Sequence, residues 1–243
     1  MNHLNEIKSY WSKRAEGYSI SNRESLKSDE KQQYEEFFKK YIPTNKKLKT
    51  IDMGCGPGFL AILLANMGCD SFAFDCTENM LLKAEENARD LGVNLNIIQG
   101  DAQNPKIEDN TFDLLVSRNL IWNLEDPEKA YKEWIRIVKP GGKIIILDGN
   151  HYCYLFYERY MEERKINGHA NELKNIMGVS PEEINRIAYD LPLSKKIRPE
   201  WDKSILTSLG VKIIDIDINE ISYKNKKNED VRLIKDFKIV CEI

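Results

Sequence analysis

Three glycines and an aspartate lie close together between residues 51 and 58, in the segment I-D-M-G-C-G-P-G. Asp52 is two residues before Gly54, and Gly56 and Gly58 follow at every second position. Glycine lets a backbone turn sharply and approach a ligand closely, and the carboxyl end of a strand is where open α/β sheets bind ligands. The spacing G-x-G-x-G differs from the dinucleotide fingerprint G-x-G-x-x-G. The segment therefore predicts a ligand-binding loop between a strand and a helix.

Two further aspartates follow predicted strands at spacings that suit an adenosine ligand. Asp75 ends the second strand, about 20 residues after the glycine loop, where a carboxylate can bind both ribose hydroxyls. Asp101, in the segment Q-G-D-A, follows the third strand and can accept from an adenine amino group, while the Ala102 amide can reach a ring nitrogen. Enzymes that bind NAD share the first of these acids, so the two aspartates alone do not distinguish NAD from another cofactor that contains adenosine.

The loop after the fourth predicted strand contains polar and aromatic side chains in the sequence S-R-N-L-I-W-N-L, which begins at residue 117. It supplies Ser117, Arg118, Asn119 and Trp122. A K-P-G-G turn at 139–142 then leads into the fifth strand. The loop after the fourth strand would lie at the same edge of the sheet as the glycine loop, because both loops follow parallel strands.

In this order and register, the motifs resemble class I S-adenosylmethionine-dependent methyltransferases, in particular the small-molecule, methyltransferase type 11-like group, over residues 48–148. The segment Y-W-S-K-R-A-E-G-Y at 10–18 also resembles the helix that folds over the cofactor in many of these enzymes. The resemblance implies that the cofactor is S-adenosyl-L-methionine and that the chain is a methyltransferase. The cofactor-binding residues that follow from it are Tyr10, Trp11, Tyr18, Asp52, Gly54, Cys55, Gly56, Gly58, Asp75, Cys76, Asp101, Ala102, Ser117 and Arg118.

The acceptor side is expected in the loop after the fourth strand and beyond the fifth. A sulfonium group activates the methyl group, so alignment supplies most of the rate, and a base is needed only for an acceptor that must lose a proton. His151 is the first candidate base and His169 the second. Arg118 is a second catalytic candidate that would bind an acidic substrate group, or would instead pair with Glu125 or Asp126. The predicted substrate-binding residues are Asn119, Trp122, His151, Tyr152 and Tyr157.

Composition limits the class of protein. The 243 residues carry a net charge of −3 and are 42% hydrophobic, which fits one α/β domain with an elaboration. This balance gives no electrostatic reason to expect a nucleic-acid or membrane partner, so a small-molecule acceptor is the expected partner. Five cysteines are scattered without a C-x-x-C pair, which predicts no metal site and a reduced, cytoplasmic setting. No apolar run approaches the ~20 residues that span a membrane, and no oligomeric state is predicted.

The predicted elements alternate between strands and helices. Strands at 50–53, 71–74, 94–98, 112–117 and 143–147 alternate with helices at 59–67, 77–91 and 127–138, and a helix at 201–209 precedes strands at 211–218 and 236–242. This order predicts a Rossmann-like, doubly wound α/β fold with a mostly parallel seven-stranded sheet, an antiparallel last strand and a helical cap insertion. The predicted parts are an N-terminal helical lid at 1–45, a methyltransferase core at 46–149 and 201–243, and a helical substrate-cap insertion at 150–200.

Three alternatives remain at this point. An NAD-dependent oxidoreductase would share Asp75 but would differ in its glycine spacing. A methyltransferase that acts on RNA or protein would use the lysines at 46–47, 195–196 and 224–227 as a basic surface, although acidic residues balance them. The absence of N-P-P-Y, D-P-P-Y and Pro-Cys motifs argues against methylation of adenine or glutamine amino groups and of cytosine C5. A non-catalytic S-adenosylmethionine-binding protein would share all of the cofactor motifs.

Overall fold

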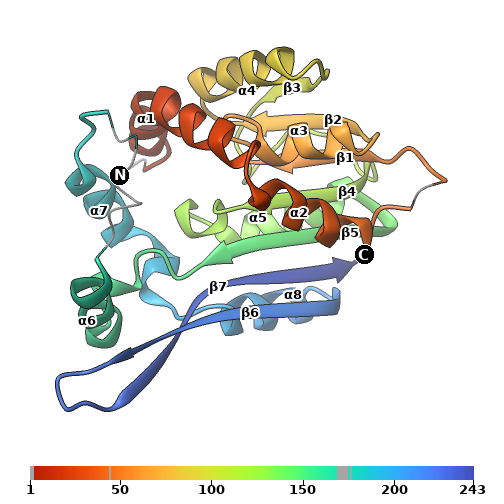
Figure 1. Ribbon diagram of the computed structural model, residues 1–243. Coiled ribbons are helices and arrows are strands. Elements are labelled where there is room, and N and C mark those ends of the chain that lie inside the picture. The colour runs from red at the N-terminus through yellow and green to blue at the C-terminus, as the bar shows by residue number, and fades with distance from the viewer. Residues whose placement is uncertain (1–2, 44, 169–174, 176) are drawn as a thin grey trace.

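A seven-stranded mixed sheet forms the centre of the computed structural model, which describes residues 3–43, 45–168, 175 and 177–243 (Figure 1). The first five strands are parallel, and β7 is antiparallel to both of its neighbours, in the order β3-β2-β1-β4-β5-β7-β6. This confirms the predicted fold. The strands are β1 (Lys49–Met53), β2 (Asp70–Asp75), β3 (Asn96–Gln99), β4 (Phe112–Arg118), β5 (Val138–Gly149), β6 (Lys212–Lys224) and β7 (Asp230–Glu242).

Helices cover both faces of the sheet because successive strand residues, which point to opposite faces, are apolar. On β4, Leu115 packs in the cluster formed with α5 (Pro127–Ile137) and α8 (Glu200–Ser208). Its neighbours Leu114 and Val116 pack in the opposite cluster, with α2 (Asp29–Lys39) and α3 (Phe59–Asn66). All three side chains are buried, as expected for parallel strands covered on both faces. Helix α4 (Glu78–Asp90) lies on the α3 side, where Leu81 packs against Ala61.

The N-terminal helix α1 (His3–Ser25) lies beside the edge at which the parallel strands end (Figure 1). It contacts α4 on one side and α7 (Pro181–Asp190) on the other. The chain between β5 and α8 contains η2 (Cys153–Leu155), α6 (Glu158–Asn167), α7 and η4 (Pro192–Lys195), and its described residues form no strand. Helices thus occupy both ranges assigned to a lid and a cap, while the division into these parts stays a prediction.

The observed strands β5, β6 and β7 are longer than those predicted. In β5, Val138 pairs with Phe112 and Lys143 with Leu114, so the K-P-G-G turn is a bulge within the strand. Strands β6 and β7 continue past the sheet as a two-stranded ribbon that reaches Lys224 and Asp230 (Figure 1). Its extension packs on the cap, where Tyr223 and Leu233 share a cluster with Cys153 and Tyr160. Helix boundaries differ from the predicted ones by a residue or two.

Candidate functional site

The glycine loop joins β1 to α3 and is held by main-chain hydrogen bonds. The amides of Gly54 and Cys55 donate to the Phe74 carbonyl at 2.8 and 3.0 Å, which fixes the loop against β2. Gly54, Gly56 and Gly58 have backbone φ angles of +72°, +51° and +88°, which residues other than glycine rarely adopt. A Cβ atom on Gly54 would lie 2.6 Å from the Leu120 side chain. The loop therefore requires glycine at these positions.

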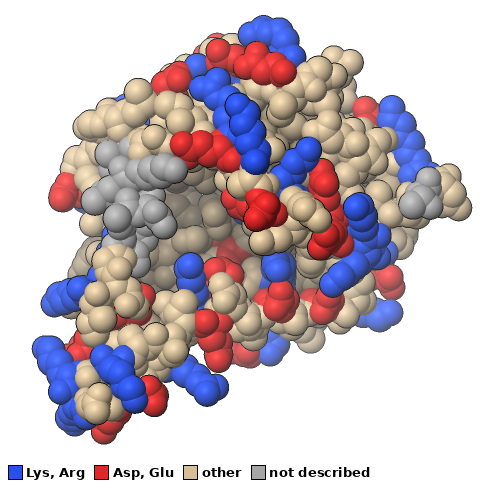
Figure 2. Space-filling model, viewed as in Figure 1, with Lys and Arg blue, Asp and Glu red and all other residues tan. Residues whose placement is uncertain are grey.

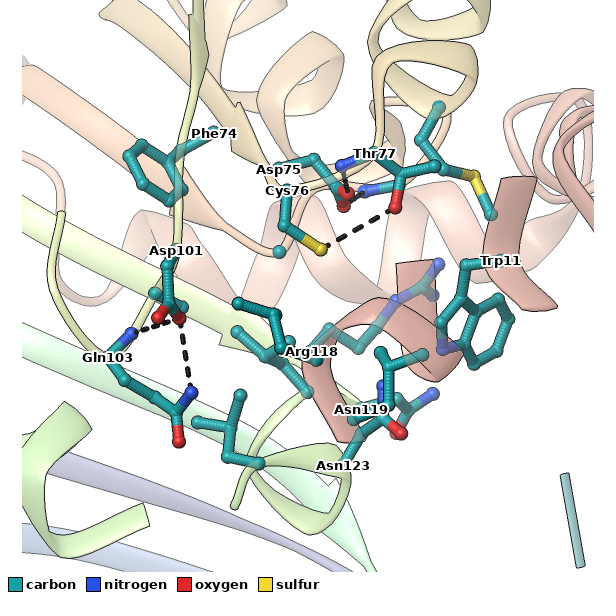
Figure 3. Close-up of a pocket in the computed structure, with 18 of the residues that line it drawn as sticks. Trp11, Phe74, Asp75, Cys76, Thr77, Asp101, Gln103, Arg118, Asn119 and Asn123 are labelled. Atoms are coloured by element: carbon teal, nitrogen blue, oxygen red, sulfur yellow. Dashed lines mark hydrogen bonds between the residues drawn. The ribbon is translucent and has the colours of Figure 1, made fainter. Parts of the chain in front are cut away.

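Asp75 ends β2 with its carboxylate turned toward the loop. One oxygen accepts from the Gly56 amide at 3.0 Å, and the other accepts from the Thr77 amide at 2.8 Å (Figure 3). Burial raises the pKa of Asp75, against the effect of these hydrogen bonds. After β3, Asp101 accepts from the Gln103 amide at 2.9 Å and from its side chain at 3.2 Å (Figure 3). The two carboxylates thus line one space from two neighbouring strand ends.

That space is a cavity of about 740 Å³, including its open mouth, which we name the first cavity. It lies at the carboxyl edge of the parallel strands, with α1 along one wall (Figure 3). Nine of the fourteen predicted cofactor-binding residues line it: Trp11, Tyr18, Gly54, Gly56, Asp75, Cys76, Asp101, Ala102 and Arg118.

The other five predicted cofactor-binding residues do not line the first cavity. The Asp52 carboxylate is buried and accepts from the Ala61 amide at 3.0 Å, and burial raises its pKa to about 7. The Cys55 thiol donates to the Gly56 carbonyl, and the Ser117 hydroxyl donates to the Met53 carbonyl at 3.0 Å. Gly58 precedes α3 as its N-cap and faces Ala84 of α4. These four hold the loop and sheet together, and Tyr10 faces a different cavity.

Arg118 pairs with a residue that the sequence did not indicate. Its guanidinium lies 3.1 Å from the Glu30 carboxylate at the start of α2 and 4.2 Å from the centre of the Phe59 ring. The predicted alternative, an ion pair with Glu125 or Asp126, is therefore wrong. Arg118 lines the first cavity and is not among the residues of its neighbour, so the structure does not bring it to the predicted acceptor side.

A second cavity adjoins the first. The two share Trp11, Tyr18 and Asn119. Four of the predicted substrate-binding residues line the second cavity, namely Asn119, Trp122, His151 and Tyr152, together with Tyr10. The Trp122 and Tyr152 rings lie 4.5 Å apart between centres. The molecule is hollowed beside α1, and acidic and basic side chains are interspersed over this face (Figure 2).

Tyr157 is not among the residues that line either cavity. Its hydroxyl donates to the Lys195 carbonyl at 2.9 Å, and its ring packs against Tyr160 in the cluster shared with Tyr223 and Leu233 of the ribbon. The prediction that Tyr157 contacts substrate therefore does not agree with its position. His169, the second candidate base, lies outside the described residues.

His151 lies beside a buried carboxylate at the end of β5. Its Nε2 atom is 3.3 Å from Asp148 and 3.1 Å from the Asn119 side-chain oxygen. Arg198 lies 2.8 Å from the other oxygen of Asp148, and both side chains are 1% exposed. Burial alone would raise the pKa of Asp148, but Arg198 and His151 outweigh it and lower this pKa to about 2. Asp148 is therefore ionised and favours a proton on Nε2, which leaves Nδ1 as the basic atom.

Comparison with known proteins agrees with this architecture. A family described as a methyltransferase domain matches residues 51–146. The demethylmenaquinone methyltransferase of a Geobacillus species is 32% identical over 133 residues, which cover 50% of this chain and 57% of that protein. A solved structure from Methanococcus maripaludis, assigned to the S-adenosyl-L-methionine-dependent methyltransferases, is 26% identical in sequence. The match covers 92% of this chain and 91% of that protein's chain, with a TM-score of 0.57.

The chain contains a class I S-adenosylmethionine-dependent methyltransferase domain, matched over residues 51–146. The cofactor of this family is S-adenosylmethionine. A further methyltransferase relative, the ubiquinone biosynthesis O-methyltransferase of Aliivibrio fischeri, is 26% identical over 76% of this chain and 75% of its own length. The chain spans about half the length of several other relatives that it matches. None of the helices among the described residues has the length and apolar character that a membrane crossing requires.

Several residues that line the two cavities were missed from the sequence. Thr77, Met80, Gln103 and Asn123 line the first cavity, and Arg14 lines the second. Arg14 had a usable signal, because it lies three residues after Trp11 and four before Tyr18 and so shares their helix face. The pairing of Asp148 with Arg198 had none, because 50 residues separate the two in the sequence.

Proposed function

We propose that this protein transfers the methyl group of S-adenosylmethionine to a small-molecule acceptor. The observation that carries the proposal is the pair of adjoining cavities, which share Trp11, Tyr18 and Asn119. One cavity has the carboxylates and glycines that suit an adenosine-containing cofactor, and the other has aromatic walls and a histidine. The names of two relatives, a demethylmenaquinone methyltransferase and a ubiquinone biosynthesis O-methyltransferase, also favour a small acceptor.

The residues of the first cavity fit S-adenosylmethionine. Asp75 can accept from the ribose hydroxyls, since it lines the cavity and a carboxylate oxygen accepts more than one hydrogen bond. Asp101 and the Ala102 amide would bind the adenine, and the open backbone at Gly54 and Gly56 would accommodate the methionine part. When bound, the cofactor supplies a methyl group that its sulfonium activates.

The second cavity would align the acceptor and take up its proton. Trp11, Tyr18 and Trp122 exclude water and hold an acceptor against the shared wall. His151 is the proposed base, and Asp148 positions its ring through Nε2. The products are the methylated acceptor, S-adenosylhomocysteine and one proton, which His151 would receive from the acceptor.

The remaining alternatives receive less support. The match to a methyltransferase domain argues against the NAD-dependent oxidoreductase. A macromolecular acceptor is less suited to a second cavity whose walls consist largely of aromatic side chains. The non-catalytic alternative would leave the contact between His151 and the buried Asp148 without a use, and activity measurements decide it directly.

Two measurements test the proposal. Calorimetry should show binding of S-adenosylmethionine and S-adenosylhomocysteine and no binding of NAD. Release of S-adenosylhomocysteine should then be measured with a panel of phenols, amines, thiols and carboxylates. Turnover of at least one small acceptor is expected. Cofactor binding with turnover of protein or RNA alone would overturn the small-molecule assignment, and a lack of cofactor binding would overturn the activity as a whole.

A further inference from the structure

A buried arginine lines the second cavity. Arg14, in the middle of α1, is 7% exposed, and its guanidinium donates to the Asn175 main-chain oxygen at 2.8 Å. Among the residues that the structure describes, no aspartate or glutamate forms an ion pair with it. A guanidinium has five N–H donors, and burial of a cation without a counter-ion is costly. The guanidinium also hydrogen-bonds the Tyr10 hydroxyl, and its remaining N–H donors suit an anionic ligand in the cavity.

The walls of the same cavity suit a flat ring. Trp122 and Tyr152 form a tilted pair, and Tyr152 continues to Tyr154 at 5.9 Å between ring centres. The Arg164 guanidinium lies 4.0 Å from the centre of the Tyr154 ring. Among the described residues that line the cavity, two arginines are present, whereas aspartate and glutamate are absent. Aromatic surfaces bind aromatic ligands by stacking, and this balance of charge favours an anion over a cation.

We propose that the second cavity takes an aromatic acid as the methyl acceptor, with its acid group on Arg14 and a ring hydroxyl beside His151. The inference rests on the proposed function, because it names the substrate class of the same site. Helix α1 would then contact both ligands with one face, since Trp11, Arg14 and Tyr18 lie at positions i, i+3 and i+7. Specificity for charge would come from this helix, and proton removal from the segment after β5.

The test compares acids with matched neutral esters. The three hydroxybenzoates and their methyl esters are titrated by calorimetry against the full-length protein loaded with S-adenosylhomocysteine, so binding is measured without turnover. Release of S-adenosylhomocysteine is then measured for the same compounds with S-adenosylmethionine. At least one acid should bind more tightly than its ester by about 10- to 100-fold, the range expected for charge-assisted hydrogen bonds. If no acid binds more tightly than its ester, the proposal is overturned.

Variants of α1 assign the preference to one side chain. Arg14→Gln should remove the preference for acid over ester, and Arg14→Lys should retain part of it because the charge remains. Lys13→Gln is the matched control, since Lys13 is exposed and pairs with Glu183 on α7. Binding of S-adenosylhomocysteine shows that each variant folds. An undiminished preference in a folded Arg14→Gln protein would overturn the role of Arg14.

The same data separate this inference from the proposed function. Methylation of neutral phenols as fast as of their acidic counterparts would leave the methyltransferase function intact and refute the anionic acceptor. Failure of the protein to bind S-adenosylmethionine would refute the proposed function itself.

Discussion

Asp75 is fixed at the wall of the first cavity by two main-chain amides, those of Gly56 and Thr77. These two hydrogen bonds orient the carboxylate before a ligand arrives. Each oxygen can still accept a second hydrogen bond. Burial raises the pKa of Asp75, against the effect of the amide hydrogen bonds. Hydroxyl donors from a ribose would add hydrogen bonds that favour the ionised carboxylate.

The first prediction concerns this carboxylate. Asp75→Ala should weaken S-adenosylhomocysteine binding by about 1.5–3 kcal/mol for each hydrogen bond lost, measured by calorimetry. Asp70→Ala is the matched control, because Asp70 begins the same strand, lies outside the first cavity and accepts from the Asn96 side chain at the surface. Thermal unfolding verifies that both proteins fold. An unchanged dissociation constant for Asp75→Ala would show that the ribose lies elsewhere.

The second prediction concerns proton removal. If His151 is the base, His151→Asn should lower turnover by roughly 10²–10⁴-fold, while the affinity for S-adenosylhomocysteine stays the same. Cofactor affinity is spared because His151 lines only the second cavity. Tyr157→Phe is the control, since it removes a hydroxyl that binds the Lys195 carbonyl outside both cavities. A rise in KM with turnover retained would instead mean that His151 only binds the acceptor.

Residues that follow strands were predictable, whereas side-chain partners distant in sequence were not. The positions of Gly54, Asp75 and Asp101 depend on local strand and loop order, which the sequence shows directly. Arg118, at the end of β4, turns toward Glu30 of α2, and Tyr157, just before α6, turns toward Lys195. Such directions depend on how separate helices pack, and hydrophobic period alone does not contain that information.

Among the elements, α1 contributes to both cavities. The first cavity is lined by Leu4, Ile7, Trp11 and Tyr18 of this helix. The second is lined by Tyr10 and Arg14, and again by Trp11 and Tyr18. Tyr10 faces differently from Trp11 because consecutive helical residues are rotated by about 100°. Tyr10 and Ile7 also pack against Ile184 and Ile187 of α7, which joins the helix to the cap.

The third prediction is that α1 becomes more ordered when the cofactor binds. Hydrogen exchange of residues 8–20 should slow in the presence of S-adenosylhomocysteine, because the ligand would fill the space beneath Trp11 and Tyr18. Helix α8 serves as the internal control, since none of its residues lines either cavity. Equal exchange of α1 in both states would show that its aromatic residues are ordinary packing.

The lengths of β6 and β7 illustrate a limit of the sequence at this scale. The predicted strands at 211–218 and 236–242 are the parts that pair within the sheet. Beyond them the chain is largely polar, and its pairing from Glu220 to Lys224 depends on the partner strand and on the cap. The stabilising contact is made by Tyr223, whose hydroxyl donates to the Arg159 carbonyl at 2.9 Å. Contacts between segments so far apart are not visible in a local pattern.

On the scale of the whole molecule, a buried ionic network joins the sheet, α5, α8 and the cap. Arg198 contacts Asp148 at the end of β5 and Asp202 on α8, and Tyr131 of α5 donates to Asp202 at 2.6 Å. Asn150 accepts from the Arg198 amide at 2.9 Å and donates to the Arg198 carbonyl at 3.0 Å. The network that orients His151 therefore also attaches the cap to the sheet.

The final prediction is a pH dependence of stability that arises from Asp148. Its pKa is about 2 in the folded protein against an ordinary value of 3.8, because Arg198 and His151 outweigh the effect of burial. A lowered carboxyl pKa adds stability that is present above pH ~4 and is lost as the pH falls toward ~2. The shift corresponds to about 2 kcal/mol. Urea unfolding should therefore show that Asp148→Asn is less stable than the natural protein by at least about 2 kcal/mol at pH 6.

This difference should begin to shrink below pH ~4, over the range in which both proteins still fold, because the natural protein then loses the charge that the variant lacks. Asp230→Asn is the control: Asp230 is exposed and pairs with Lys224 at the end of the ribbon, so its removal should matter by less than about 1 kcal/mol at every pH. A difference for Asp148→Asn that stays constant down to pH 3 would mean that the carboxylate acts through its shape and hydrogen bonds rather than through its charge.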